Sequence, residues 1–341
     1  MKTILVTGGA GFIGSNFIPY FLNTNPEVRI VNLDLLTYAG NLENLSEVKD
    51  NERYKFIQGD IRDRSLVNEL FQKYDFKGVI HFAAESHVDN SIKNPGVFIE
   101  TNVNGTFILV DEAFKAWMEK PFSYKEGYEG CRFHHISTDE VYGTLGETGL
   151  FTEITPYAPN SPYSASKASS DMIVRSYHHT YGLDTLITNC SNNYGPKQHD
   201  EKLIPTVIRK SLFGENIPIY GDGKNIRDWL YVLDHCTGID IAYRIGKAGE
   251  VYNIGGRNER NNNYIAETIC TLLDEIIPKL EGSYKDQITY VEDRAGHDRR
   301  YAIDATKLET ELGWKADENF ESGIRKTIEW YIKQYHDLET V

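Results

Sequence analysis

The stretch Thr7-Gly8-Gly9-Ala10-Gly11-Phe12-Ile13-Gly14 follows a short apolar run, Ile4-Leu5-Val6, at the start of the chain. Glycines at these spacings allow a tight turn from a strand into a helix and a close backbone approach to a pyrophosphate. The first turn of such a helix presents free N–H groups to an anion. Asp34 closes the next predicted strand and can bond a ribose, whereas Leu35 and Leu36 offer no cation for a 2′-phosphate. The stretch therefore predicts a dinucleotide site that takes NAD rather than NADP.

Outward from this turn, the first half of the chain alternates short β-branched runs with amphipathic stretches, which is typical of βαβ units and a parallel sheet. We predict strands at residues 2–6, 29–33, 54–58, 78–82, 132–137 and 184–189, and helices at 65–74, 96–118 and 164–181. The polar stretch 119–130 is predicted to be a surface loop, and Pro19 should kink the first helix.

The predicted fold class is therefore α/β, with a Rossmann-type, doubly wound parallel sheet and a smaller α+β C-terminal lobe. We expect the NAD-binding domain to span residues 1–196 and the substrate-binding lobe residues 197–341. A segment near 230–255 is expected to return to the first domain.

The composition excludes several classes of protein. The 341 residues carry 36 Lys+Arg against 50 Asp+Glu, a net charge of −14, which argues against broad binding to nucleic acid or to an anionic membrane. The four cysteines (Cys131, Cys190, Cys236, Cys270) are far apart and form no CxxC pair, so we expect neither a metal site nor disulfides. No apolar run is long enough for a membrane span, and the first residues lack the pattern of a signal peptide. These features predict a soluble cytoplasmic protein.

A second motif, Tyr163-Ser164-Ala165-Ser166-Lys167, places a tyrosine and a lysine on one face of a helix. A tyrosine with the ordinary pKa of about 10 is a poor base at neutral pH, and lowering that pKa by about three units costs roughly 4 kcal/mol. One ammonium group about 4 Å away supplies about that much at an effective dielectric near 20. We therefore expect Lys167 to lower the pKa of Tyr163, although such a pair alone is also common on helix surfaces.

These motifs, with Ser137 at the end of a predicted strand, resemble the extended short-chain dehydrogenase/reductases over essentially the whole chain. The stretch Ser137-Thr138-Asp139-Glu140-Val141-Tyr142-Gly143, with residues 33–45, 81–89 and 293–304, narrows the resemblance to sugar-nucleotide 4,6-dehydratases, in particular those that act on dTDP-glucose. Epimerases of the superfamily usually carry small residues in place of Asp139 and Glu140. A 4,6-dehydratase for a UDP-, CDP- or GDP-sugar, a 4-epimerase and a non-catalytic NAD-sensing module remain alternatives.

The resemblance implies a catalytic cycle in which NAD is not consumed. Tyr163, supported by Lys167, removes the C4 hydroxyl proton while NAD takes the C4 hydride. Glu140 then abstracts the C5 proton, and protonated Asp139 delivers a proton to the departing C6 hydroxyl. The hydride returns to C6, and Thr138 bonds the C4 hydroxyl. Two neighbouring carboxyls that repel each other's charge can hold the distinct protonation states that this chemistry needs.

The resemblance also assigns the binding residues. NAD is expected to contact Gly8, Gly11, Phe12, Ile13, Gly14, Asp34, Leu35, Leu36, Thr37, Asp60, Ile61, Phe82, Ala83, Ala84, Glu85, Ser86, Thr101, Ser137, Tyr163, Lys167 and Asn193. The nucleotide sugar is expected to contact Ser86, Thr138, Asn192, Lys202, Leu203, Pro218, Ile219, Tyr220, Arg227, Asn262, Asp293, Arg294, Ala295, Gly296 and His297.

An acidic protein needs local cations to bind a diphosphate. We expect Arg227 and Arg294 near it, because a planar guanidinium binds such a group bidentately, and we interpret Arg299 and Arg300 as part of a solvated face. The helices predicted at 96–118 and 164–181 are apolar on more than one side, which predicts a homodimer built on them.

Overall fold

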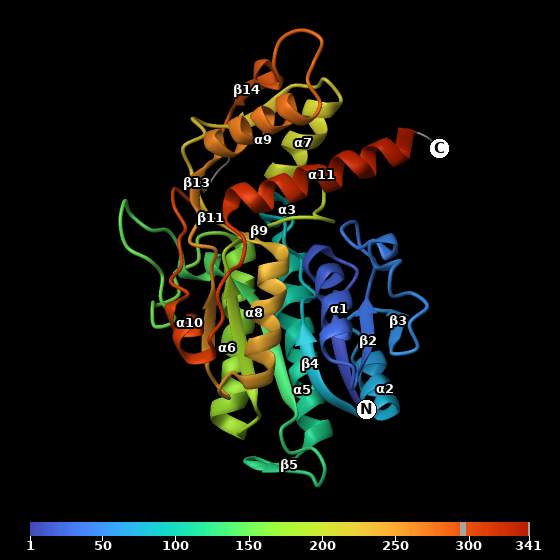
Figure 1. Ribbon diagram of the computed structural model, residues 1–341. Coiled ribbons are helices and arrows are strands. Elements are labelled where there is room, and N and C mark those ends of the chain that lie inside the picture. The colour runs from blue at the N-terminus through green and yellow to red at the C-terminus, as the bar shows by residue number, and fades with distance from the viewer. Residues whose placement is uncertain (294–297, 340–341) are drawn as a thin grey trace.

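A parallel sheet of seven strands forms the centre of the computed structural model, which describes residues 1–293 and 298–339 (Figure 1). The strand order is β12-β8-β7-β4-β1-β2-β3. These strands are β1 (Lys2–Thr7), β2 (Val28–Asp34), β3 (Tyr54–Gln58), β4 (Phe76–His81), β7 (Arg132–Thr138), β8 (Thr185–Cys190) and β12 (Val251–Ile254). The order reverses between β1 and β4, which is the place where ligands bind in open sheets of this kind.

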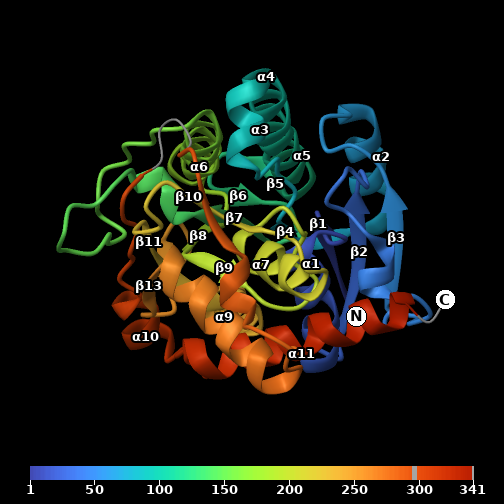
Figure 2. The same ribbon diagram turned by 90° about the horizontal axis from the view of Figure 1, so that it is seen from above.

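Helices cover both faces of the sheet, because successive side chains of a buried strand point to opposite sides. Ile4 and Val6 pack on one side with α1 (Phe12–Thr24), α8 (Val232–Ile245) and α10 (Thr306–Leu312). Leu5 packs on the other side with α2 (Arg64–Tyr74), α5 (Thr106–Trp117) and α6 (Pro162–Tyr181). Figure 2 shows α2, α5 and α6 on one side of the strands and α1 on the other.

The C-terminal lobe lies above the carboxyl ends of the strands (Figure 1). Its larger elements are α7 (Leu203–Leu212), α9 (Asn262–Ile276), α11 (Phe320–Glu339), the paired strands β10 (Ile217–Tyr220) and β14 (Ile288–Val291), and a sheet of β9 (Asn192–Tyr194), β11 (Ile226–Tyr231) and β13 (Glu259–Asn261). Short helices complete the chain: η1 (Leu42–Leu45), α3 (Val88–Lys93), η3 (Asp139–Tyr142) and η4 (Tyr284–Gln287). Ile204, Ile217 and Ile265 belong to a separate apolar core of this lobe.

The predicted α/β fold and its six strands are confirmed, with boundaries that shift by one or two residues. The seventh strand of the sheet, β12, comes from the segment after α8 and pairs with β8. Within the described residues no helix is both long enough and apolar enough to cross a membrane.

The prediction of one regular helix over residues 96–118 is wrong. The chain forms α4 (Pro95–Phe98), a π-helical segment η2 (Ile99–Gly105) and then α5. Asn102 explains the wider turns, because its amide exchanges hydrogen bonds of 2.8 and 3.0 Å with the Glu85 backbone and donates to Ser166 Oγ at 2.8 Å. Single π-turns of this kind are common at functional sites. The predicted loop at 119–130 begins in a small hairpin of β5 (Met118–Lys120) and β6 (Ser123–Tyr124).

Candidate active site

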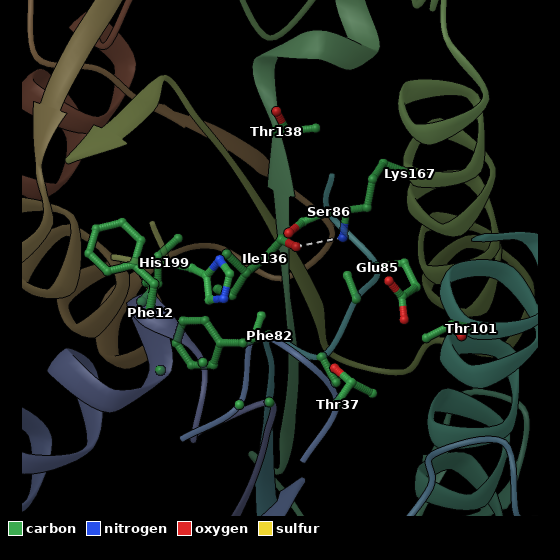
Figure 3. A pocket seen from close by; sticks show the side chains of 18 of the residues that line it. Phe12, Thr37, Phe82, Glu85, Ser86, Thr101, Ile136, Thr138, Lys167 and His199 are labelled. Carbon is green, nitrogen blue, oxygen red and sulfur yellow. Dashed lines mark hydrogen bonds between the residues drawn. The ribbon is translucent and has the colours of Figure 1, made fainter. Parts of the chain in front are cut away.

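A pocket of about 480 Å³ opens where the strand order reverses, between the carboxyl ends of the central strands and the first residues of the lobe (Figure 3). Most of the residues expected to bind NAD or to act in catalysis line it, as do Asn192 and Lys202, which were expected at the substrate. They are Gly8, Gly11, Phe12, Ile13, Gly14, Asp34, Leu35, Thr37, Asp60, Ile61, Phe82, Ala83, Ala84, Glu85, Ser86, Thr101, Ser137, Thr138, Asp139, Glu140, Tyr163, Lys167, Asn192, Asn193 and Lys202.

The glycine turn has the geometry that a pyrophosphate requires. Gly8 has a φ of +71°, and a Cβ there would lie 2.5 Å from the Ala83 amide nitrogen of the neighbouring loop. A Cβ on Gly11 would meet only the Gly8 carbonyl oxygen, at 3.4 Å, so this position is open toward the pocket. Gly11 is also the residue that precedes α1, whose first N–H groups face the same space. The residues present therefore fit a dinucleotide.

Two acids line the pocket beside this turn. Asp34 at the end of β2 accepts hydrogen bonds from the backbone N–H groups of Ala10 (2.9 Å) and Leu36 (2.8 Å), which fix both loops. Burial raises the pKa of Asp34, and those two bonds oppose the increase. Burial also acts to raise the pKa of Asp60, but hydrogen bonds from Arg62 outweigh it and the pKa is lowered. The Arg62 guanidinium is thereby paired with Asp60, at 2.6 Å.

Tyr163 and Lys167 lie in the first turns of α6, which begins with a capping box between Ser161 and Ser164. The Lys167 Nζ donates to the Ile136 carbonyl at 2.8 Å (Figure 3). It also lies 3.4 Å from His135 Nε2. Burial lowers the pKa of Lys167 to about 8.

The charge of Lys167 alone does not bring the pKa of Tyr163 below its ordinary value in this arrangement of the residues. Burial and the nearby charge of Glu140 hold that pKa well above its ordinary value. The Lys167 amine also donates a hydrogen bond to the Ile136 carbonyl of β7. A further positive charge in the pocket is therefore needed before Tyr163 can act as a base at neutral pH.

The acids Asp139 and Glu140 start the short helix η3 directly after β7, where Thr138 Oγ1 accepts a hydrogen bond of 3.3 Å from the Glu140 N–H. Asp139 is 1% exposed, and its Oδ2 has no hydrogen-bond partner among the described residues. Burial, Glu140 and Asp228 together raise the pKa of Asp139 well above its ordinary value. The raised pKa favours the protonated form of Asp139, which can donate a proton, whereas Glu140 is only half-buried. These two neighbours have the properties of a general acid and a base.

Several residues expected to bind the substrate lie elsewhere. Leu203, Pro218, Ile219, Tyr220, Arg227, Asn262 and Asp293 do not line this pocket, nor does Leu36, which packs against the core. The Ile219 side chain is buried in the core of the lobe, so only the backbone of this residue can contact a ligand. Arg294, Ala295, Gly296 and His297 lie outside the described residues.

The interpretation of Arg300 as a solvated residue is also wrong. Arg300 is 8% exposed, makes two hydrogen bonds to the Glu259 carboxylate (2.6 and 2.8 Å) and donates to the Gly149 carbonyl at 2.9 Å. Arg299 is exposed, as expected, and pairs with Asp222 at 3.1 Å.

The residues that line the pocket include a segment that the sequence did not predict. Gln198, His199 and Glu201 line the pocket after β9, next to the predicted Lys202. The Lys202 Nζ donates to the Ser86 carbonyl at 3.2 Å, so this segment joins the lobe to the loop after β4. A polar run that directly follows a strand was the available signal, because loops at the carboxyl ends of strands form the sites of such sheets.

Comparison with known proteins agrees with this geometry. The family model of GDP-mannose 4,6 dehydratase matches residues 5–327. A dTDP-glucose 4,6-dehydratase from Xanthomonas campestris pv. campestris (strain B100) is 56% identical over 333 residues, which are 97% of this chain and 93% of that protein. The chain belongs to the dTDP-glucose 4,6-dehydratase family.

Solved members of this family have the same fold. The structure from Streptomyces venezuelae, with NAD and TYD bound, is 44% identical with a TM-score of 0.88, and 98% of each chain is covered. The structure from Bacillus anthracis in complex with NAD is 46% identical with a TM-score of 0.86, again over 98% of each chain. A UDP-glucose 4-epimerase from Thermotoga maritima also reaches a TM-score of 0.84, at 28% identity over 98% of this chain and 100% of that one. The fold therefore does not separate the two activities, and the residues of the site must.

Proposed function

We propose that the protein is an NAD-dependent dTDP-glucose 4,6-dehydratase, a hydro-lyase that forms dTDP-4-keto-6-deoxyglucose and water. The single observation that carries this function is the acid pair after β7, where the buried Asp139, whose pKa is raised well above its ordinary value, lies beside the half-buried Glu140. A 4-epimerase has no step for such a pair. A sensor that only binds NAD needs neither this pair nor Tyr163 and Lys167.

Each residue has one task in this reaction. Bound NAD supplies a hydride acceptor for C4, a hydride donor for C6 and a positive ring beside Tyr163. Tyr163 takes the proton of the C4 hydroxyl. Glu140 takes the C5 proton made acidic by the C4 ketone, and Asp139 gives its proton to the departing C6 hydroxyl, which leaves as water. C5 is reprotonated at the end, so Tyr163 has gained a proton and Asp139 has lost one, and both must return to their starting states.

The test is an isotope experiment with dTDP-glucose carrying deuterium at C4. If the hydride stays with one enzyme molecule, the 4-keto-6-deoxy product carries deuterium at C6, as mass spectrometry or NMR can establish. Label that appears in free reduced cofactor would contradict the closed cycle, and a C4-epimerised sugar that keeps its C6 hydroxyl would favour the epimerase. UDP-, CDP- and GDP-glucose, assayed in parallel, test the choice of nucleotide.

The same proposal includes a homodimer built on α5 and α6. Apolar side chains are exposed on α5 (Phe107, 40%), on α6 (Met172, 49%) and on the η2 segment that precedes α5 (Ile99, 45%). The mass in solution at micromolar concentration is expected to be twice that of the chain, and Phe107→Glu is expected to reduce it. A strictly monomeric mass would contradict the dimer. All four cysteines are free and buried, which supports a reducing compartment such as the cytoplasm.

A further inference from the structure

Near Lys167, but outside the lining of the pocket, is a buried acid that the reaction described above does not use. Asp171 lies one turn after Lys167 on α6, and both Asp171 and the neighbouring His135 on β7 are fully buried. Asp171 Oδ2 accepts a hydrogen bond from Ser137 Oγ at 2.9 Å, and its Oδ1 lies 3.2 Å from His135 Nε2. The same His135 nitrogen lies 3.4 Å from Lys167 Nζ. His135 Nε2 thus lies within 3.4 Å of both the Lys167 amine and the Asp171 carboxylate.

The charges of this cluster depend on one another. Burial raises the pKa of Asp171 to about 6, and the charge of Lys167 opposes that increase. Burial lowers the pKa of Lys167 to about 8, and the charge of Asp171 opposes that decrease. Asp171 and Lys167 are therefore both charged only between about pH 6 and about pH 8.

The other titratable groups of the neighbourhood are neutral in that range. On the sheet, burial holds the pKa of His81 (β4) and His135 (β7) well below the ordinary value. Burial raises the pKa of Cys190 at the end of β8 to about 12. Tyr142 in η3 and Tyr157 in the following loop have pKa values raised by burial. Asp171 is therefore the negative charge that faces Lys167 within this cluster.

His135 contributes geometry rather than charge. His135 Nε2 lies 3.4 Å from Lys167 Nζ and 3.2 Å from Asp171 Oδ1. A neutral imidazole carries one ring proton, so Nε2 accepts from the ammonium in one tautomer and donates to the carboxylate in the other. The Ile136 carbonyl, at 2.8 Å, accepts a hydrogen bond from the ammonium in both.

We propose that Asp171 and His135 are positioning residues for the oxidation step, which hold Lys167 charged and in place beneath Tyr163. This inference rests on the proposed function. The charge of Lys167 helps Tyr163 to accept the C4 hydroxyl proton, and Asp171 acts through Lys167 without touching the substrate.

The experiment measures turnover of dTDP-glucose between pH 5.5 and 9 by Asp171→Asn, with cofactor content checked by absorbance. Loss of the carboxylate lowers the pKa of Lys167 further, so the decline of kcat on the basic side is expected to shift down by about one pH unit, a loss of about fivefold at pH 8 that approaches tenfold at pH 9. KM for dTDP-glucose should stay within about twofold, because no substrate contact changes. His135→Gln, which can still accept a hydrogen bond, should lower kcat without shifting the pH profile.

Two further variants separate a role through Lys167 from a structural role. In the Lys167→Met background, Asp171→Asn should add less than a twofold loss, because residues that act as one unit are not additive. Glu112→Gln removes another buried acid, whose carboxylate lies 2.6 Å from the Arg64 guanidinium. Glu112 does not line the pocket, so this variant should leave the pH profile unchanged. Asp171→Ser, measured in the same way, replaces Asp171→Asn if that variant does not fold.

The outcomes are distinct. A wild-type pH profile for a folded, cofactor-loaded Asp171 variant overturns the inference, as does a full additional loss in the Lys167→Met background. Failure of the wild-type protein to dehydrate dTDP-glucose overturns the proposed function instead.

Discussion

The carboxyl end of the central sheet and the C-terminal lobe differ in how they hold their functional residues. At the sheet, Thr138, Asp139 and Lys167 are buried, and each lies on or directly after a regular element with a defined cap. In the lobe, the residues expected at the substrate are on short strands, on loops or at the first positions of helices, and Tyr220 is 43% exposed. Rigid elements position reacting groups more precisely than loops do. We therefore propose that the chemistry belongs to the sheet and the choice of substrate to the lobe.

One segment connects the two regions. Residues 195–202 run from β9 to α7 along the pocket, and the Tyr331 hydroxyl of α11 donates to the Gln198 carbonyl within it. Lys202 reaches the Ser86 carbonyl of the sheet side at 3.2 Å. A change in this segment should therefore affect both regions, whereas changes in either region alone should have separable effects.

The largest effect is expected at the sheet end, from the two acids. Asp139→Asn removes the buried proton donor, so expulsion of the C6 hydroxyl should slow by about 10²–10⁴-fold. Glu140→Gln leaves C4 oxidation intact but removes the base for C5. Substrate should then produce a reduced-nicotinamide absorbance that persists, without exchange of the C5 proton in deuterated water.

The two variants differ from each other in a measurable way. Slow C5 exchange should remain in Asp139→Asn, because Glu140 is intact there, and it should be absent from Glu140→Gln. If both variants eliminated water at the wild-type rate, the roles given to these acids would be wrong.

A smaller effect is expected in the lobe, at Arg227. This guanidinium lies 4.3 Å from the centre of the Tyr301 ring and donates to the Asp298 carbonyl at 2.9 Å. Arg227→Lys removes the planar group, so KM for dTDP-glucose should rise about tenfold while kcat stays within about twofold. Arg325→Lys is the matched control. Arg325 on α11 forms an exposed ion pair with Glu275 of α9, and this substitution should change neither KM nor kcat. An equal fall in kcat would show that this part of the lobe takes part in the chemistry.

The same contrast decides how much the sequence predicts. The strands of the sheet are predictable, because they are continuous apolar runs between turn signals, and the glycine turn follows from its spacing. The π-helical segment Ile99–Gly105 is not, because its apolar pattern also fits a regular helix and the hydrogen bonds of Asn102 to Glu85 and Ser166 decide the geometry. Local pattern cannot show bonds that only the tertiary structure forms.

Within the site, the sequence identifies residue types better than it identifies their surroundings. Asp139 and Glu140 can be named from their adjacency, but only the structure shows which of the two is buried and protonated. Asp171 was not singled out, because an acid four residues after a lysine usually forms an exposed helix pair. In the structure Asp171 is instead buried, and it contacts His135 and Ser137, which are distant in the sequence.

The smallest effect is expected from a bond that ties the connecting segment to α1. Pro19 lies inside α1, which continues to Thr24, and it has no N–H to donate to the Ser15 carbonyl four residues earlier. Lys197 Nζ donates to that carbonyl instead, at 3.1 Å, and also pairs with the exposed Glu47 at 3.0 Å. The lysine that follows β9 thus replaces the hydrogen bond that the proline removes from the first helix.

A double-mutant cycle tests this replacement. Lys197→Met leaves a carbonyl of the buried Ser15 without its partner, so the free energy of unfolding should fall by about 1–2 kcal/mol. In the Pro19→Ala background the new N–H can bond Ser15, and Lys197→Met then loses only the pair with Glu47, at most about 0.5 kcal/mol. Urea unfolding of the four proteins, at a fixed NAD concentration, measures the difference. If Lys197→Met lowered the free energy of unfolding equally in the two backgrounds, Lys197 would stabilise the junction through Glu47 alone. The bond to the Ser15 carbonyl would then not couple the connecting segment to α1.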